Sequence, residues 1–168
     1  MRLFFALWPP PEAARALSEW AAALEAATAG KPTAVEKIHL TLAFLGEADP
    51  AKALAAGRRV RGRAFDFPVD LARYWRENHI VWAGPKMMPR ELEQVVRDLH
   101  AALAEQGFMI DPRPFRTHIT LLRKARAPRA LPPLPPIAWR ASEFVLVRSA
   151  LSPKGSTYEP IERFALRA

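Results

Sequence analysis

Two stretches of the chain share a pattern in which a histidine is followed two residues later by a threonine. The first copy contains His39 and Thr41, and the second contains His118 and Thr120, 79 positions further on. Both copies read His-aliphatic-Thr-Leu. An imidazole transfers protons near neutral pH, and a hydroxyl donates hydrogen bonds. Two such pairs facing each other would supply an acid, a base and two hydrogen-bond donors to one reacting group.

Each copy lies in an apolar run, and this composition predicts a β-strand. Side chains alternate between the two faces of a strand, so a histidine and a threonine two residues apart point the same way. Leu40 and Leu42 would then face the core in the first strand, and Ile119 would do so in the second. Each strand is therefore predicted to carry catalytic groups on one face and core residues on the other.

The chain has 168 residues, which is the size of one compact domain. It carries 25 Lys and Arg against 17 Asp and Glu, a formal charge of +8, and arginine outnumbers lysine. Arginine is suited to bidentate contact with phosphate, so an anionic partner is expected. Richness in arginine and alanine also fits a GC-rich genome, and that alternative stays open.

Cysteine is absent, which excludes disulfides, thiolate chemistry and cysteine-ligated zinc. No apolar stretch is long enough to span a membrane, and the apolar run at residues 1–8 is interpreted as a strand and not as a signal peptide. We therefore expect a soluble, cytoplasmic protein without a membrane partner. The 17 prolines and the scarcity of Asn and Gln suggest a heat-adapted (thermophile) source.

The order of elements predicts an α+β fold. Strands are expected over residues 3–8, 39–45, 65–75, 79–83, 117–124, 139–151 and 158–166, and helices over residues 11–30, 49–63 and 90–107. The repeated motif suggests an internal duplication within a single domain of residues 1–168, with lobes roughly 1–84 and 85–168. Each pseudo-symmetric lobe would be an antiparallel sheet with helices on its outer face, and the active-site cleft would lie between the lobes.

The chain closely resembles the RNA 2′,3′-cyclic phosphodiesterases, historically called 2′-5′ RNA ligases, of the two-histidine (2H) phosphoesterase superfamily. The resemblance runs nearly end to end and rests on both motifs together with residues 2–7, 43–46, 81–84, 113–117, 144–146 and 155–159. Thr117 is a departure, because the family usually has proline before the second histidine.

The resemblance implies hydrolysis of RNA 2′,3′-cyclic phosphate ends to 2′-phosphomonoesters, with no metal and no cofactor. It also implies that His39 is the general acid to the ribose 3′ oxygen and His118 the base toward water, with Thr41 and Thr120 donating to the phosphate oxygens. The residues alone do not distinguish these histidine roles from the reverse. The same path run backwards would join RNA ends, such as tRNA halves, through a 2′-5′ linkage without ATP. The expected partner is RNA with cyclic phosphate ends, including tRNA fragments, bound by a monomer.

Four further residues are candidate substrate contacts. Arg116 and Arg123 flank the second motif and could bind phosphate, or they could be solvated residues at the strand ends. Phe44 could stack on a nucleobase, although its alternation with Leu40 and Leu42 favours the core. Tyr158 could reach the cleft from the terminal hairpin or could serve packing alone.

Other classes of function remain as alternatives. A non-catalytic RNA-binding module would explain the arginines but would not need two matched His-Thr pairs. A metallohydrolase is disfavoured, because the chain has no His-Glu-x-x-His and no carboxylate near either motif. Within the superfamily, a small nucleotide-derived cyclic phosphate is the main competing substrate.

Overall fold

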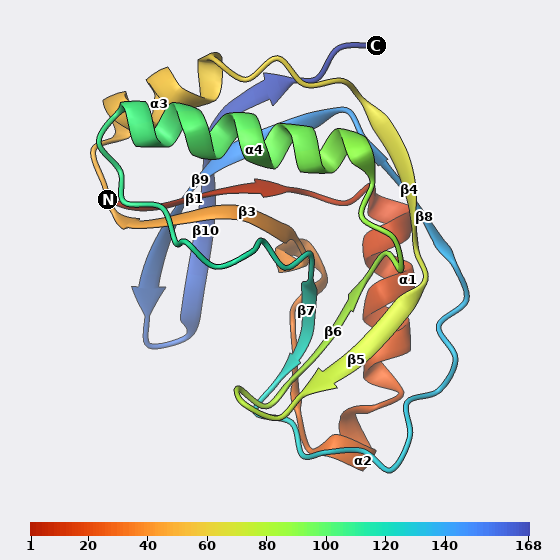
Figure 1. The fold of residues 1–168 in the computed structure, drawn as a ribbon. Helices are drawn as coiled ribbons and strands as arrows, with labels where there is room; N and C mark the ends of the chain where they lie inside the picture. Colours follow the sequence, from red (N-terminus) through yellow and green to blue (C-terminus); the bar gives the residue numbers. More distant parts are fainter.

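One curved antiparallel sheet forms the centre of the computed structural model, which describes residues 1–168 (Figure 1). Its strand order is β10-β9-β1-β3-β7-β6-β5, and the short β2 pairs with β7. The strands are β1 (Arg2–Leu7), β2 (Lys31–Pro32), β3 (Leu40–Glu47), β5 (Leu71–Trp75), β6 (Ile80–Gly84), β7 (Ile119–Arg123), β9 (Glu143–Ser152) and β10 (Gly155–Ala165). A separate two-stranded sheet is formed by β4 (Phe65–Val69) and β8 (Ile137–Ala141).

The long sheet consists of two parts that meet at one point. Strands β10, β9, β1 and β3 form one part, and β7, β6 and β5 form the other. Between β3 and β7 only Leu40 and Ile119 are paired. The two parts bend away from each other at this pair, and the bend gives the molecule its open inner side (Figure 1).

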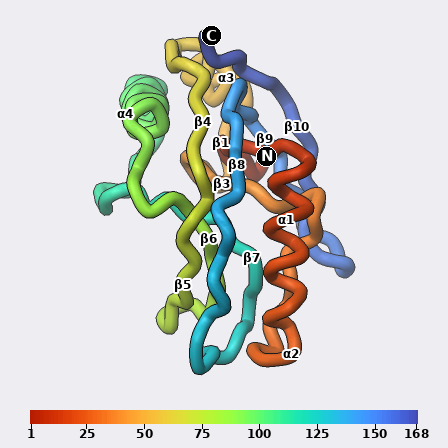
Figure 2. The backbone as a smooth tube through the Cα atoms, turned by 90° about the vertical axis from the view of Figure 1, so that its right-hand side faces the viewer, coloured from red at the N-terminus to blue at the C-terminus, as the bar shows by residue number.

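The helices cover the outer side of this bend. They are α1 (Pro11–Ala22), α2 (Glu25–Thr28), the 3₁₀ helix η1 (Val35–Lys37), α3 (Pro50–Arg58) and α4 (Arg90–Glu105). Helix α1 packs against β7 and β8, whereas α3 and α4 pack on each other and on β3, β9 and β10 (Figures 1 and 2). The expected two-lobed α+β fold with antiparallel strands and outer helices is confirmed. Each spatial lobe nevertheless draws elements from both halves of the chain, since β9 and β10 lie beside β1.

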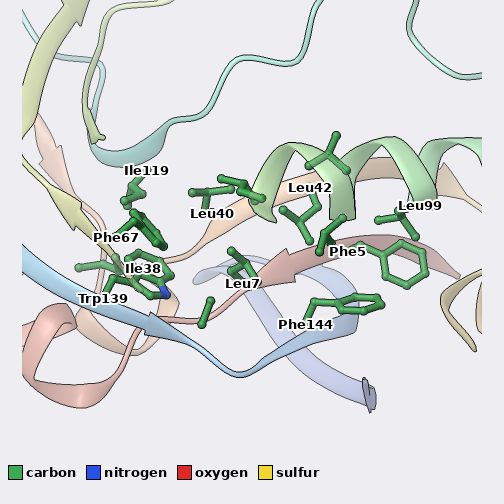
Figure 3. Packing of buried hydrophobic residues seen from close by; sticks show 14 of the residues in the cluster. Phe5, Leu7, Ile38, Leu40, Leu42, Phe67, Leu99, Ile119, Trp139 and Phe144 are labelled. Atoms are coloured by element: carbon green, nitrogen blue, oxygen red, sulfur yellow. The ribbon is translucent and has the colours of Figure 1, made fainter. Parts of the chain in front are cut away.

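A continuous core fills the space between the sheet and the helices (Figure 3). Alternate residues of β1, among them Phe5 and Leu7, point into it and meet Leu42 and Leu99. The opposite face of β1 is also covered, because Phe4 and Ala6 pack with residues of β9 on the inner side. Both faces of β1 are therefore buried, which explains why its sequence is a continuous apolar run.

Three expected elements are divided or shorter in the structure. The first helix ends at Ala22 and resumes as α2, where the Thr28 hydroxyl donates to the Leu24 carbonyl (2.7 Å); such bonds bend a helix. The second helix ends at Arg58, so Arg61 and Arg63 lie outside it. The predicted strand over 65–75 is two strands in different sheets, because the chain turns at Asp70, whose carboxylate accepts from the Lys86 amide (2.8 Å).

The terminal hairpin also differs from its prediction. The expected strand over 139–151 is divided at Ser142, with β8 pairing to β4 and β9 pairing to β1 and β10. A helix of sufficient length and apolarity to cross a membrane is not found in the structure.

Leu99 of α4 provides a test of this core. Its side chain is fully buried, so Leu99→Ala should lower the free energy of unfolding by about 2–5 kcal/mol through lost burial and the cavity left behind. Denaturant unfolding measures the change. Leu151→Ala is the control, since Leu151 is 75% exposed at the hairpin tip and should change stability by less than about 0.5 kcal/mol. Equal losses in both variants would contradict this packing.

Candidate active site

The first histidine lies immediately before β3, and contacts at both of its ring nitrogens fix its orientation. Its Nδ1–H donates to the carbonyl of Lys37 at 2.7 Å, because a carbonyl can only accept. Its Nε2 accepts from the hydroxyl of Thr41 at 3.1 Å. With the proton of the neutral ring on Nδ1, Nε2 is the nitrogen of His39 that gains or loses a proton.

The second histidine repeats this construction immediately before β7. The Nδ1–H of His118 donates to the carbonyl of Arg116 at 2.8 Å, again two residues earlier in the chain. The Nε2 of His118 and the hydroxyl of Thr120 have no hydrogen-bond partner within the protein. The Nε2 lone pair of His118 is therefore available to a ligand.

The pairing of β3 with β7 brings the two motifs together. Leu40 and Ile119 are antiparallel partners, so continuing that register sets His39 opposite Thr120 and Thr41 opposite His118. The two paired residues point into the core, and their neighbours point to the inner side of the bend. The structure thus gathers the four predicted catalytic residues into a quartet on the inner side around this one pair, and Thr41 and His118 line the same groove.

Aromatic rings enclose His39. The Trp8 indole stacks on its imidazole with ring centres 4.8 Å apart and an angle of 13° between the planes. Tyr158 meets the imidazole edge-on at 5.5 Å, and Phe4 lies at 5.1 Å. Tyr158, predicted as a hairpin residue that could reach the cleft, is thus in direct contact with the first histidine.

A second aromatic group supports His118. The Trp75 ring lies 4.9 Å from the imidazole, and Trp82 approaches it edge-on at 6.5 Å. The Arg116 guanidinium lies over the Trp75 ring at 3.8 Å and also pairs with Glu77 at 3.6 Å. Arg116 therefore lies at the rim of the site, where Glu77 partly neutralises its charge.

Arg123, the other predicted arginine, has a different environment. It lies at the end of β7 and forms no ion pair with a carboxylate in the structure. Its positive charge acts on both His39 and His118. Arg123 is thus the uncommitted cation of the site.

Phe44 lies on the inner face, so the expectation of a core position is wrong. The pairing of β1 with β3 skips one residue of β3 between Thr41 and Ala43, which is a β-bulge at Leu42. The bulge shifts the alternation, so that Phe44 lies opposite Phe4 and is 62% exposed. The Nε2–H of His100 donates to the carbonyl of the bulged Leu42 at 3.0 Å and holds this irregular point.

A groove of about 510 Å³ leads away from the quartet. Thr41 and His118 lie at its inner end, and Phe44, Phe115 and Arg113 are among the residues along its walls. A second cavity of about 600 Å³ adjoins Trp8 and Tyr158 but contains neither histidine. The first groove is the one that offers space beside the reactive groups.

Both catalytic candidates have a lowered pKa. Burial is the main cause for His39, with the charges of Arg123 and His118 adding to it and the Lys37 carbonyl opposing it. Burial is also the main cause for His118, where Arg116 and Arg123 add to the effect and the bond to the Arg116 carbonyl opposes it. At neutral pH the two free imidazoles are therefore chiefly uncharged.

The residues available for metal binding are few. No three His, Cys, Asp or Glu side chains gather into a group that could hold a metal ion. Of the two remaining histidines, His79 contacts Tyr74, and His100 bonds the Leu42 carbonyl and lines the groove beside the quartet.

The tryptophans that pack on the two histidines are not predictable from the sequence. Trp8 ends the first apolar run directly before three prolines, and Trp75 ends a strand of alternating character. Neither position carries a local signal of contact with a residue far away in the chain. Thr117, which stands where the family usually has proline, donates its hydroxyl to the Met88 sulfur at 2.9 Å.

Comparisons with known proteins agree on one family. The model of the LigT-like phosphoesterases matches the chain twice, over residues 7–82 and 83–158. An RNA 2′,3′-cyclic phosphodiesterase of Escherichia coli (strain K12) is 39% identical over 98% of this chain and 96% of its own length. One of Thermus thermophilus is 35% identical over 99% of this chain and 91% of its own. The structure of E. coli LigT with 3′-AMP superposes with a TM-score of 0.89 at 37% identity, covering 98% of this chain and 97% of that one.

The histidine environments can be tested by titration. NMR of the ring protons should give apparent pKa values below 6.5 for both His39 and His118. Arg123→Ala removes a cation that disfavours the imidazolium form, so both values should rise toward 6.5. Arg97→Ala, on the outer face of α4, is the control of equal charge and should leave both unchanged. Unaltered titration in the Arg123 variant would show that this residue is not close to the histidines.

Proposed function

The chain belongs to the LigT-like phosphoesterase family, and on that premise we propose that it hydrolyses 2′,3′-cyclic phosphate ends of RNA to 2′-phosphomonoesters. One observation carries the proposal: pairing of Leu40 with Ile119 sets two proton-transfer groups and two hydroxyl donors around one point. Opening a cyclic phosphodiester requires a proton to be taken from water and another to be given to the departing ribose oxygen. The quartet contains the groups for both transfers.

The reaction is one displacement at phosphorus. Water attacks while His118 Nε2 accepts one of its protons, the new oxygen–phosphorus bond forms, and the bond from phosphorus to the ribose 3′ oxygen breaks. In the reacting form of the protein His39 is protonated at Nε2 as well as at Nδ1; it donates the Nε2 proton to that departing oxygen, and the phosphate stays on the 2′ oxygen. The two histidines then exchange protons with solvent to restore the starting state.

The surroundings of the rings support this division of roles. His118 Nε2 has no protein partner, so its lone pair is free for the attacking water. The indole of Trp8 stacked on His39 favours a cationic ring, because a positive charge over an aromatic face is attracted to it. This attraction opposes the effect of burial and suits His39 to the role of acid.

Negative charge on the phosphate oxygens needs donors in place before the reaction. The hydroxyls of Thr41 and Thr120 face the inner side. Once His39 is protonated at Nε2, the Thr41 hydroxyl no longer donates to it, and both hydroxyls can donate to the two non-bridging oxygens. Arg123 contributes an uncommitted positive charge near both histidines. Arg116, held by Trp75 and Glu77, adds positive charge at the rim.

The groove beside the quartet is suited to the terminal nucleoside. Phe44 offers an exposed aromatic face, and stacking of a base on an aromatic ring contributes about 1–3 kcal/mol. The hydroxyl of Tyr158 forms no hydrogen bond within the protein and can reach the ribose from the His39 side. We assign the base to the Phe44 groove and the sugar to the space between Tyr158 and His118.

The proposed substrates are RNA fragments in the cytoplasm, including tRNA halves, acted on by a monomer. Stacking and phosphate contacts do not read base edges, so little sequence preference is expected. The displacement run in reverse would attach a 5′ hydroxyl to the cyclic phosphate. Slow 2′-5′ ligation without ATP should therefore accompany hydrolysis.

The product and the histidine variants test this function together. An oligonucleotide with a 2′,3′-cyclic phosphate end should yield only the 2′-phosphate, identified with enzymes that discriminate 2′ from 3′ phosphates. His39→Ala and His118→Ala should each lower kcat by about 10²–10⁴-fold, and Thr41→Ala should lower it less. Arg97→Ala is the control, since Arg97 is an exposed residue of α4 that pairs with Glu93 and does not line the groove. A 3′-phosphate product, or near-normal turnover by His118→Ala, would overturn the mechanism.

Chelation should leave the activity intact. The two histidines supply the proton transfers, and the threonines with Arg123 supply the donors and positive charge for the transition state. Turnover is to be measured in EDTA and after adding back Mg²⁺, Mn²⁺ or Zn²⁺. Loss of activity in EDTA that one of these ions restores would contradict the proposed mechanism.

A further inference from the structure

A basic cavity of about 600 Å³ lies at the ends of β5, β6 and β7, away from the groove beside the quartet. Its walls include Arg76, Lys124 and Arg126, together with Tyr74 and His79. None of the catalytic candidates and no carboxylate lines it. The β5–β6 turn and the segment after β7, which supply these residues, lie at the lower end of this part of the sheet in Figure 1.

Its three cationic side chains have no acidic partners. Arg76, Lys124 and Arg126 form no ion pair in the structure, and no carboxylate lines the cavity to offset their charge. Like charges that converge without counter-charges repel each other and attract anions. The charge of the cavity is therefore suited to a phosphate group.

The backbone around this cavity is held in an uncommon conformation. Only three residues other than glycine have a positive φ, and two of them, His79 (56°) and Lys124 (52°), line this cavity. Such positions persist where surrounding contacts enforce them, and they gather at ligand sites.

Hydrogen bonds around Tyr74 hold His79 and the segment after β7 in this conformation. The Tyr74 hydroxyl donates to the Ala125 carbonyl (2.8 Å) and accepts from the Nδ1–H of His79 (3.2 Å). The Ala125 amide donates to the His79 carbonyl (2.9 Å). These bonds tie the β5–β6 turn to the segment after β7, so the floor of the cavity is preformed.

Strand β7 connects this cavity to the active site. It begins next to His118, carries Thr120 and Arg123, and is followed at once by Lys124. Lys31 of β2 is paired with Arg123, so a row of cations runs from the quartet to the cavity. Thr120 and Lys124 are four residues apart, which is about 13 Å at roughly 3.3 Å per residue. A ligand that reaches both places must be longer than one cyclic nucleotide.

We infer that this cavity binds a backbone phosphate of the RNA chain whose cyclic phosphate end lies at the quartet. The inference rests on the proposed function and specifies its substrate as an oligonucleotide. Because the reacting phosphate is at the 3′ terminus, every other phosphate of the chain lies on its 5′ side. The chain leaves the quartet along Arg123 and Lys31 and reaches the pocket formed by Arg76, Lys124 and Arg126.

The test compares substrates of two lengths in a triple variant. Arg76→Gln, Lys124→Asn and Arg126→Gln remove the three charges, and asparagine tolerates the positive φ at position 124. For an RNA of about ten nucleotides with a cyclic phosphate end, kcat/KM should fall by about five- to tenfold, through KM. The log–log salt slope should shrink by about 0.7 for each phosphate that the variant no longer neutralises. A mononucleotide 2′,3′-cyclic phosphate should be hydrolysed as by the unaltered protein.

The control variant removes the same charge elsewhere. Arg58→Gln, Arg59→Gln and Arg97→Gln change residues at the end of α3 and on α4, and they should leave both substrates unaffected. Equal losses for both substrates in the cavity variant, or equal losses in the two triple variants, would overturn the inference. So would an unchanged KM for the long RNA.

Direct binding separates this inference from the proposed reaction. Fluorescence anisotropy with a labelled RNA of the same length, ending in a 2′-phosphate, requires no turnover. Weaker binding by the cavity variant than by the control supports the phosphate site, even if neither substrate is hydrolysed. Absence of hydrolysis would contradict only the proposed function. Equal affinity in the two variants overturns the phosphate site.

Discussion

The backbone pairing of Leu40 with Ile119 is the constraint on which the rest of the structure depends. Both side chains are fully buried in the main core, and their neighbours on the other face are the two histidines and two threonines. A slip of one residue in this pairing would turn the apolar side chains to solvent and the catalytic side chains to the core. The free energy of core burial therefore also sets the register of the active site.

The two histidines are alike in backbone geometry and differ in surroundings. Each donates Nδ1–H to the carbonyl two residues earlier, which leaves Nε2 as the reactive nitrogen on both sides. His39 is stacked beneath Trp8 and bonded to Thr41, whereas His118 packs against Trp75 and has a free Nε2. Unlike residues thus surround the two copies of the motif, and in the proposed mechanism this difference makes one histidine the acid and the other the base.

Much of this arrangement follows from the sequence, but its irregular parts do not. The sequence predicts that His39 and Thr41 share one face, because side chains alternate between the two faces within a single strand. Phe44 does not follow this alternation, because a β-bulge at Leu42 shifts the residues after it by one. The bulge forms where β3 pairs with β1, so the sequence of β3 alone does not predict it. Contacts such as Trp8 on His39 join elements through tertiary packing, which leaves no local pattern. The division of residues 65–75 between two sheets likewise arises from partners far away in the chain.

The net charge of the chain does not reveal which of its cationic residues are paired with carboxylates. A count of +8 treats every arginine alike, yet those paired with carboxylates, such as Arg59 with Glu105, are locally neutralised. Each ion pair contributes zero to the net charge, so the excess of positive charge comes from residues outside the ion pairs. Several of these, including Arg123, Lys31 and Lys124, follow β7 from the quartet to the end of the sheet. Positive charges along β7 would attract an anionic chain toward the two histidines, which is the basis of the proposed phosphate site at the end of this strand.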